Sequence, residues 1–378
     1  IEEGWRLLYT REGRAAEVSA DRLILATGAL ERPMPLPGWT LPGVMTVGAG
    51  QILLKTSGQV PRGPVWIAGT GPLAYLFAVQ LLSAGVEISG VLDTRAPGSI
   101  RGSLGPAASA LLGRPADLAK GLTWLARIKR RCRHIAHVGH LRAEGDGALE
   151  RITYTVAGRA PVSVAARHLF VHEGLVPAIH PTMALGCAHR WSPAQDSYAP
   201  VVDPWGETSM PRVFAAGDLS GIGGARVACL EGELAAIGMA RALGRCTRGD
   251  AQRHAAPVRR RLVREMAVRP FLDQAYRPRP AARVPEDEAL ACRCEEVTAG
   301  RIRALCRTGA GEPNRIKSLS RAGMGACQGR LCNYTVAHIL ADETGADPSA
   351  IGLYRVRPPF RPVTLDALAR LGTTQADP

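Results

Sequence analysis

Four cysteines near the C-terminal end of the chain form two close pairs. One residue separates Cys292 from Cys294, four separate Cys327 from Cys332, and thirty-two lie between the pairs. Thiolates are soft ligands, and four of them saturate either a 2Fe–2S cluster or a tetrahedral zinc ion. Structural zinc usually uses pairs separated by two residues, so these spacings favour the 2Fe–2S cluster, and zinc is the alternative.

The residues around these cysteines suit an anionic centre. We expect a helix over residues 325–341 that starts near Cys327, because free backbone N–H groups and the helix dipole stabilise thiolate there. Gly323 and Gly325 let the backbone approach the sulfurs, and Lys317 and Arg321 add positive charge. The other five cysteines are expected to be core residues rather than ligands: Cys132, Cys187, Cys229, Cys246 and Cys306.

The cysteine runs resemble a known domain. Cys292-Arg-Cys-Glu-Glu296, together with the run from Gly323 to Cys332, is similar to the bacterioferritin-associated-ferredoxin (BFD)-like 2Fe–2S domain over roughly residues 291–344. That domain occurs fused to flavoproteins. The resemblance implies that the four paired cysteines are the cluster ligands.

Two short motifs resemble parts of a flavin site. Leu23 to Gly28 is an apolar strand ending in Ala-Thr-Gly, and Val213 to Asp218 is a strand ending in Gly-Asp before a glycine-rich turn. Each is weak alone, but a nucleotide fold between them resembles two-dinucleotide-domain flavoproteins related to pyridine nucleotide–disulfide reductases. The resemblance implies that FAD lies near Thr27, Gly28, Gly217, Asp218, Gly223 and Gly224. Asp218 would bind the ribitol, and the helix after Gly224 would point at the flavin or pyrophosphate.

A Gly-x-Gly-x-x-Gly fingerprint on a first strand, upstream of Thr27, is expected in such proteins but is missing from this chain. We therefore expect the chain to begin inside the FAD domain, with the first βαβ unit absent. On that interpretation the chain carries part of an FAD site.

The middle of the chain carries a dinucleotide-binding pattern. Gly69, Gly71 and Ala74 fit Gly-x-Gly-x-x-Gly/Ala between a strand and a helix, and Asp93 ends the next strand twenty-four residues after Gly69. The glycines would permit a tight turn against a pyrophosphate, and Asp93 would hold a ribose diol. Arg95 would instead suit a 2′-phosphate, so NAD, NADP, another adenine nucleotide and a vacant fold all stay open.

These patterns predict an α/β flavoprotein in which an NAD(P)-type Rossmann domain interrupts the FAD domain and a small helical BFD-like 2Fe–2S domain follows. The expected limits are 1–58 for the partial FAD domain, 59–165 for the nucleotide domain, 166–248 for the FAD-domain return, 249–288 for a linker with a short helix, 289–345 for the cluster domain and 346–378 for a tail.

The formal net charge of +14 invites a nucleic-acid interpretation. However, only four of the 47 basic residues are lysines, and the arginines are spread along the chain, so we favour a solvated basic surface and no nucleic-acid partner. No apolar run is long enough to predict a transmembrane helix, and no signal peptide is visible. The expected location is the cytoplasm, with peripheral attachment to the inner face of the membrane as the alternative.

The whole arrangement resembles the larger subunit of heteromeric amino-acid and opine dehydrogenases, a group that includes hydroxyproline dehydrogenase, opine oxidase and hydrogen cyanide synthase. Supporting stretches are Gly71-Pro-Leu, Gly186 to Trp191 and Arg357 to Val363. The resemblance implies an oxidoreductase subunit that relays electrons from a smaller FAD-dependent amino-acid oxidase-like partner to an unknown acceptor. We assign no catalytic residue. The alternatives are an NAD(P)H-dependent flavin and iron–sulfur reductase and a non-enzymatic ferredoxin-like module.

Overall fold

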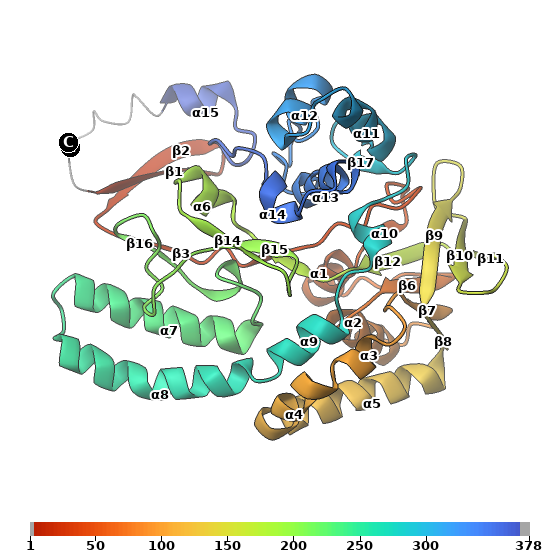
Figure 1. Ribbon diagram of the computed structural model, residues 1–378, viewed down its shortest axis with the longest axis horizontal. Helices are drawn as coiled ribbons and strands as arrows, with labels where there is room; N and C mark the ends of the chain where they lie inside the picture. The colour runs from red at the N-terminus through yellow and green to blue at the C-terminus, as the bar shows by residue number, and fades with distance from the viewer. Residues whose placement is uncertain (1–3, 371–378) are drawn as a thin grey trace.

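A five-stranded parallel sheet, here called the central sheet, is the largest sheet in the computed structural model, which describes residues 4–370; its strands lie in the right half of Figure 1. Its strand order is β5 (Val44–Thr46), β12 (His168–His172), β6 (Val65–Gly69), β7 (Gly90–Asp93) and β8 (Arg133–Ala136). β6 and β7 are buried throughout, as expected for short apolar strands covered on both faces.

Helices cover one face of this sheet and strands cover the other. α2 (Pro72–Ser83) and α5 (Pro115–Arg131) pack together on the first face, with α1 (Val47–Ser57) beside α2. The second face packs against an antiparallel sheet of β9 (Val138–Glu144), β10 (Arg151–Val156) and β11 (Val162–Ala165). The expected βαβ unit is confirmed, and α3 (Ser99–Gly102) and α4 (Leu104–Gly113) extend the connection after β7.

The central sheet is wider than the range 59–165 predicted for the nucleotide domain. β5 lies before that range and β12 lies after it, yet β12 pairs in parallel with both β5 and β6. Sequence periodicity shows that β12 is a buried strand but not which sheet it joins, because that is settled by long-range pairing.

The flanking segments come together as small sheets beside the central one. β16 (Val213–Ala215) pairs in parallel with β3 (Leu23–Leu25), and β13 (Leu175–Pro177) pairs antiparallel with β4 (Ala29–Glu31). The hairpin β14–β15 (His189–Ser192 and Ser197–Pro200) lies next to them, after α6 (His180–Ala184). The 3₁₀ turn η1 (Gly217–Leu219) leads from β16 to α7 (Ala225–Ala242).

The predicted linker with a short helix is wrong at its start, because residues 248–266 form the long helix α8 (Arg248–Met266). A capping box between Thr247 and Asp250 begins the helix, and α8 packs along α7 (Figure 1). Arg259 on α8 lies over the ring of Trp205 at 4.4 Å, so this arginine has a structural role. α9 (Arg269–Ala275) and α10 (Pro280–Arg283) follow.

The cysteine-rich segment is a small helical unit. It contains β17 (Leu290–Cys292), β18 (Val297–Thr298), α11 (Ala299–Arg307), α12 (Pro313–Ser320), α13 (Asn333–Thr344) and α14 (Pro348–Ile351) around one apolar core. Tyr354 belongs to this core, so the unit extends beyond the predicted limit at residue 345.

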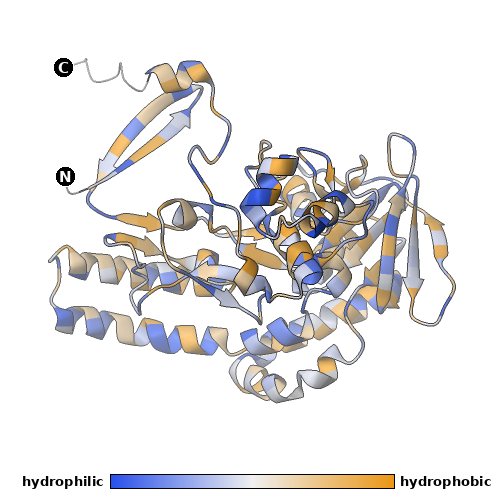
Figure 2. Cartoon of the chain, turned by 45° about the horizontal axis from the view of Figure 1, so that its top comes forward, coloured by the Kyte–Doolittle hydropathy of each residue, from blue (hydrophilic) through white to orange (hydrophobic). Residues whose placement is uncertain are grey.

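The hairpin β1–β2 (Trp5–Arg11 and Arg14–Ala20) projects from the body with α15 (Leu365–Ala369) beside it (Figure 2). Glu12 and Gly13 form its turn with positive φ angles. Across the part of the chain that the structure describes, no helix is long and apolar enough to span a bilayer.

Candidate functional site

A cavity of about 380 Å³ lies where the two predicted nucleotide motifs meet. The glycine turn after β6 contributes Gly71, and the turn after β16 contributes Asp218, Gly223 and Gly224. Motifs about 150 residues apart in sequence therefore line one space.

Two helices begin at this cavity without side-chain caps. α2 starts after Gly71 and α7 after Gly224, and neither N-cap residue provides a side-chain hydrogen bond. Free N–H groups and the positive ends of the helix dipoles therefore face the same space. Such an arrangement favours an anionic group such as a phosphate.

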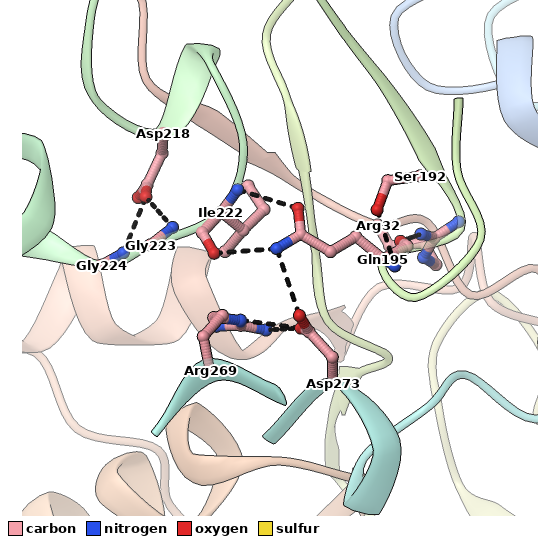
Figure 3. Close-up of polar contacts among 9 residues, drawn as sticks. All are labelled: Arg32, Ser192, Gln195, Asp218, Ile222, Gly223, Gly224, Arg269 and Asp273. Atoms are coloured by element: carbon pink, nitrogen blue, oxygen red, sulfur yellow. Dashed lines mark hydrogen bonds and ion pairs between the residues drawn. The ribbon is translucent and has the colours of Figure 1, made fainter. Parts of the chain in front are cut away.

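Asp218 organises the turn before α7. Its Oδ1 accepts hydrogen bonds from the backbone N–H groups of Gly223 and Gly224, both at 2.8 Å (Figure 3). A Cβ on Gly223 would lie 2.3 Å from the side chain of Val227, so a close approach within the turn requires this glycine.

The other flavin-motif residues, Thr27, Gly28 and Gly217, are not among the residues that line the cavity. Gly28 has φ +69° and no atom within 4 Å of an added Cβ, which leaves room for a ligand. The hydroxyl of Thr27 donates to the carbonyl of Ala178 at 3.0 Å. Gly217 accommodates a positive φ angle at the start of η1 and is buried.

Gln195, at the tip of the β14–β15 hairpin, connects three parts of the cavity wall (Figure 3). Its side chain exchanges two hydrogen bonds of 2.9 Å with the backbone of Ile222, and its Nε2 lies 3.4 Å from Asp273 on α9. Sequence reasoning missed this residue, since an isolated loop glutamine carries no recognisable pattern.

His172 ends β12 at the cavity and is held by a carboxylate. Its Nδ1 lies 2.5 Å from Oε1 of Glu31, whose Oε2 accepts from the backbone of Gly48 at 2.7 Å. The neighbouring Glu173 is fully buried, and burial raises its pKa although Arg279 opposes this. His172 is the last residue of β12, which belongs to the central sheet.

The nucleotide-motif residues are engaged in packing and hydrogen bonds within the protein. A Cβ on Gly69 would lie 1.9 Å from the carbonyl oxygen of His172, so this glycine serves strand packing. Ala74 is buried in the helix-side core. Asp93 is fully buried and accepts from the hydroxyl of Tyr75 at 2.9 Å and the guanidinium of Arg95 at 2.8 Å.

The four paired cysteines come together as two side-chain pairs, Cys292 with Cys332 and Cys294 with Cys327. Hydrogen bonding from Cys332 lowers the pKa of Cys292 to about 6, against burial and with help from backbone N–H groups of Gly323 and Glu295. Among residues 4–370, no three His, Cys, Asp or Glu side chains gather closely enough to hold a single metal ion.

Glycines and one tyrosine shape the space around these thiols. A Cβ on Gly325 would lie 2.3 Å from Cβ of Cys294, which confirms the predicted close approach of the backbone there. The ring of Tyr354 packs against Gly323 and Gly329, and its buried hydroxyl lies beside the thiol of Cys332. Burial and the adjacent Cys332 and Cys292 raise the pKa of Tyr354.

The predicted helix start at Cys327 is wrong, because α13 begins at Asn333 and Cys332 is its N-cap residue. Cys327 lies in the preceding turns, which supply its thiol with the backbone N–H groups of Leu331 and Gly329. The charge of Arg321 is paired with Glu295 at 2.8 Å. Cys306 and Cys187 are buried as expected, but Cys229 is exposed, so its assignment to the core is wrong.

The cysteine unit docks against the cavity wall through a buried ionic group. His338 on α13 lies 3.0 Å from Asp196, which also pairs with Arg32 at 3.4 Å. Burial opposes ionisation of Asp196, but His338 and Arg32 outweigh it and lower its pKa to about 2. Arg32 lines the cavity and donates to the carbonyls of Gln195 and Asp196. One short hairpin tip therefore contacts both sites.

Comparison with known proteins agrees with this architecture. Residues 1–232, more than half of the chain, match the pyridine nucleotide-disulphide oxidoreductase family, and residues 289–371 match the sarcosine oxidase A3 domain. The structure of L-proline dehydrogenase from P. horikoshii superimposes with a TM-score of 0.69 at 21% identity, covering 98% of this chain and 63% of that chain. That likeness shows a shared fold.

Individual relatives are more specific. One of the subunits of opine oxidase from Rhizobium meliloti (strain 1021) is 44% identical over 360 residues, which are 93% of this chain and 76% of the relative. The HcnB subunit of hydrogen cyanide synthase from Pseudomonas aeruginosa is 35% identical over 98% of this chain and 81% of the relative. The chain therefore belongs to the FAD-dependent oxidoreductases of the pyridine nucleotide-disulphide oxidoreductase family, in the group that contains HcnB and this opine oxidase subunit.

Proposed function

We propose that the chain is the electron-transfer subunit of a heteromeric amino-acid or opine-type dehydrogenase. A smaller FAD-dependent subunit would oxidise the C–N bond, and this chain would carry FAD and a 2Fe–2S cluster. The observation that carries the proposal is the shared hairpin tip, where Gln195 lines the cavity and Asp196 holds the cysteine unit through His338.

The proposed flavin ligands are the two predicted motifs, Thr27 and Gly28 on one side and Gly217, Asp218, Gly223 and Gly224 on the other. The open space at Gly28 and the uncapped start of α7 support this assignment. The proposed role of Asp218 is to hold the turn with one carboxylate oxygen while the other accepts from the ribitol.

The proposed cluster ligands are Cys292, Cys294, Cys327 and Cys332. Two thiol pairs suit two iron atoms with two thiolates each, whereas zinc would take all four around one ion. Backbone N–H groups at the sulfurs and the hydroxyl of Tyr354 beside Cys332 would stabilise negative charge on the cluster. When bound, flavin and cluster together divide a two-electron reduction into one-electron transfers.

The test is anaerobic reduction of the complete complex, co-expressed with its smaller partner, by amino acids and opines. We expect visible iron–sulfur absorption and, after substrate addition, the electron paramagnetic resonance signal of a reduced 2Fe–2S cluster. Cys327→Ser should lose the signal, whereas Cys306→Ser should keep it, because Cys306 packs in the core of the unit. Four zinc-bound thiolates without iron, or a cluster that substrate never reduces, would contradict the proposal.

A further inference from the structure

The dinucleotide pattern in the middle of the chain predicts a place for NAD or NADP, and the residues around it can be tested for that fit. In a dinucleotide fold, the pyrophosphate lies over the glycine turn and the acidic residue ending the second strand binds the ribose. Both places must be open to a ligand. In this chain, residues 269–279, here called the strap, run across them.

The strap covers the glycine turn. A Cβ built on Gly71 would lie 4.0 Å from Cβ of Tyr276 and 3.9 Å from Nε2 of His172. The ring of Tyr276 also packs edge-on against Tyr75 of α2, with ring centroids 6.2 Å apart. Tyr276 and His172 therefore lie at van der Waals distance from the place of a side chain at Gly71 and narrow the space over the glycine turn that a pyrophosphate would use.

The ribose place is closed as well. Asp93 accepts three hydrogen bonds of 2.8 to 3.0 Å, from the hydroxyl of Tyr75 and from the backbone and guanidinium of Arg95. Nε2 of His134 lies 3.6 Å from the same carboxylate. Burial opposes ionisation of Asp93, but His134 and Arg95 outweigh it, and its pKa lies below the usual value. A ribose diol would have to displace these partners from a fully buried carboxylate.

Arg95, the residue that would suit a 2′-phosphate, is covered too. Its guanidinium is bonded to Asp93 and lies 5.6 Å from the ring centre of Tyr276. Tyr276 thus lies against the cation that is predicted to suit the 2′-phosphate of NADP.

The strap is anchored at several points. Asp273 pairs with Arg269 within α9 and reaches Gln195. Gln274 donates to the carbonyl of Gly102 at 2.6 Å, and Arg279 lies 3.3 Å from the buried Glu173. Because these partners lie on α3, β12 and the hairpin tip, opening the strap would break contacts on three sides of the cleft.

We propose that the strap replaces the dinucleotide, so that the middle domain binds neither NAD nor NADP and serves as a scaffold between the two halves of the flavin fold. The remaining cavity is then reached by ligands from the Asp218 side. This inference does not depend on the cysteine unit, so it stands or fails separately from the proposed electron-transfer role.

The test is equilibrium titration of the flavin-loaded full-length protein with NADH, NADPH and ADP-ribose, followed by calorimetry. For the wild type we expect no saturable binding up to about 1 mM. Tyr276→Ala should bind ADP-ribose at least about tenfold more tightly than the wild type, whereas Tyr276→Phe, which keeps the ring, should not. Arg95→Ala removes both a donor to Asp93 and the cation under the ring of Tyr276, so it should give the same gain in affinity for ADP-ribose. This variant provides the test if Tyr276→Ala does not fold.

Two results would overturn the proposal. One is micromolar binding of NADH or NADPH by the wild type, which would mean that the cleft is open in solution. The other is a folded Tyr276→Ala or Arg95→Ala protein whose affinity for ADP-ribose equals that of the wild type, which would mean that the strap is not what excludes the nucleotide.

Discussion

Replacing Glu231 by glutamine should make the stability of the protein less dependent on pH between pH 5 and pH 8. Glu231 lies on α7, near the carboxylate of Asp218, and accepts from the backbone N–H of Gly217. Burial raises its pKa to about 7, and its Oε2 is buried with no partner among the described residues. Glutamine keeps an acceptor for Gly217 and removes the charge.

The folded and unfolded states bind different numbers of protons at Glu231, and this difference sets the direction in which stability changes with pH. Since the pKa of Glu231 is about 7 in the folded protein and 4.5 in an unperturbed side chain, the folded state binds more protons between these values. Its contribution to stability is fully present below pH 4.5 and is lost as the pH rises through 7. Between pH 5 and pH 8 the wild type should lose about 2.5 kcal/mol from this group, and Glu231→Gln should lose none of it.

The assay is urea unfolding of wild type and variant at pH 5, 6, 7 and 8, followed by tryptophan fluorescence. The difference between the two proteins is the quantity to use, because His180 acts in the opposite direction over an overlapping pH range. Glu233→Gln removes the same charge from an exposed position on the same helix and controls for net charge. A variant-minus-wild-type difference that is constant within about 0.5 kcal/mol from pH 5 to pH 8 would refute the reasoning.

Three further outcomes follow from buried contacts. Asp196→Asn should destabilise the protein by about 3 kcal/mol or more at neutral pH, since it leaves Arg32 and His338 without their carboxylate. The difference in unfolding free energy between wild type and variant, measured in urea, should shrink as the pH falls from 3.8 towards 2. Equal stability of the two proteins at pH 7 would argue against the ionic group. Burial lowers the pKa of His180 to about 4, so the stability that the neutral imidazole contributes above pH 6.5 is lost as the pH falls towards 4. His180→Phe should therefore flatten the acid side of the curve of melting temperature against pH. An unchanged curve would contradict this. Gly325→Ala should lower iron content in the purified protein, because its Cβ would collide with Cβ of Cys294, whereas Gly311→Ala, whose Cβ meets nothing closer than 3.8 Å, should leave iron content unchanged.

Local pattern was sufficient for the elements that carry the motifs. The strand, glycine turn and helix of Val65 to Ser83 and the start of α7 after Gly224 lie where turn chemistry and hydrophobic periodicity place them. The cysteine pairs were equally local, since four cysteines at short spacings are visible without a fold. These signals depend on neighbours within a few residues, which is the range over which propensity and capping act.

Long-range placement had to come from the folded chain. Nothing near His172 in sequence indicates that β12 joins the central sheet, nor that Glu31, 141 residues away, will hold its ring. The strap is the clearest case. Its Arg- and Pro-rich sequence is typical of a linker, yet Tyr276 packs over Arg95 and the glycine turn. The glycine fingerprint predicts the shape of a turn, but whether that turn is open to a nucleotide depends on which distant side chains fill it, and only tertiary packing selects them.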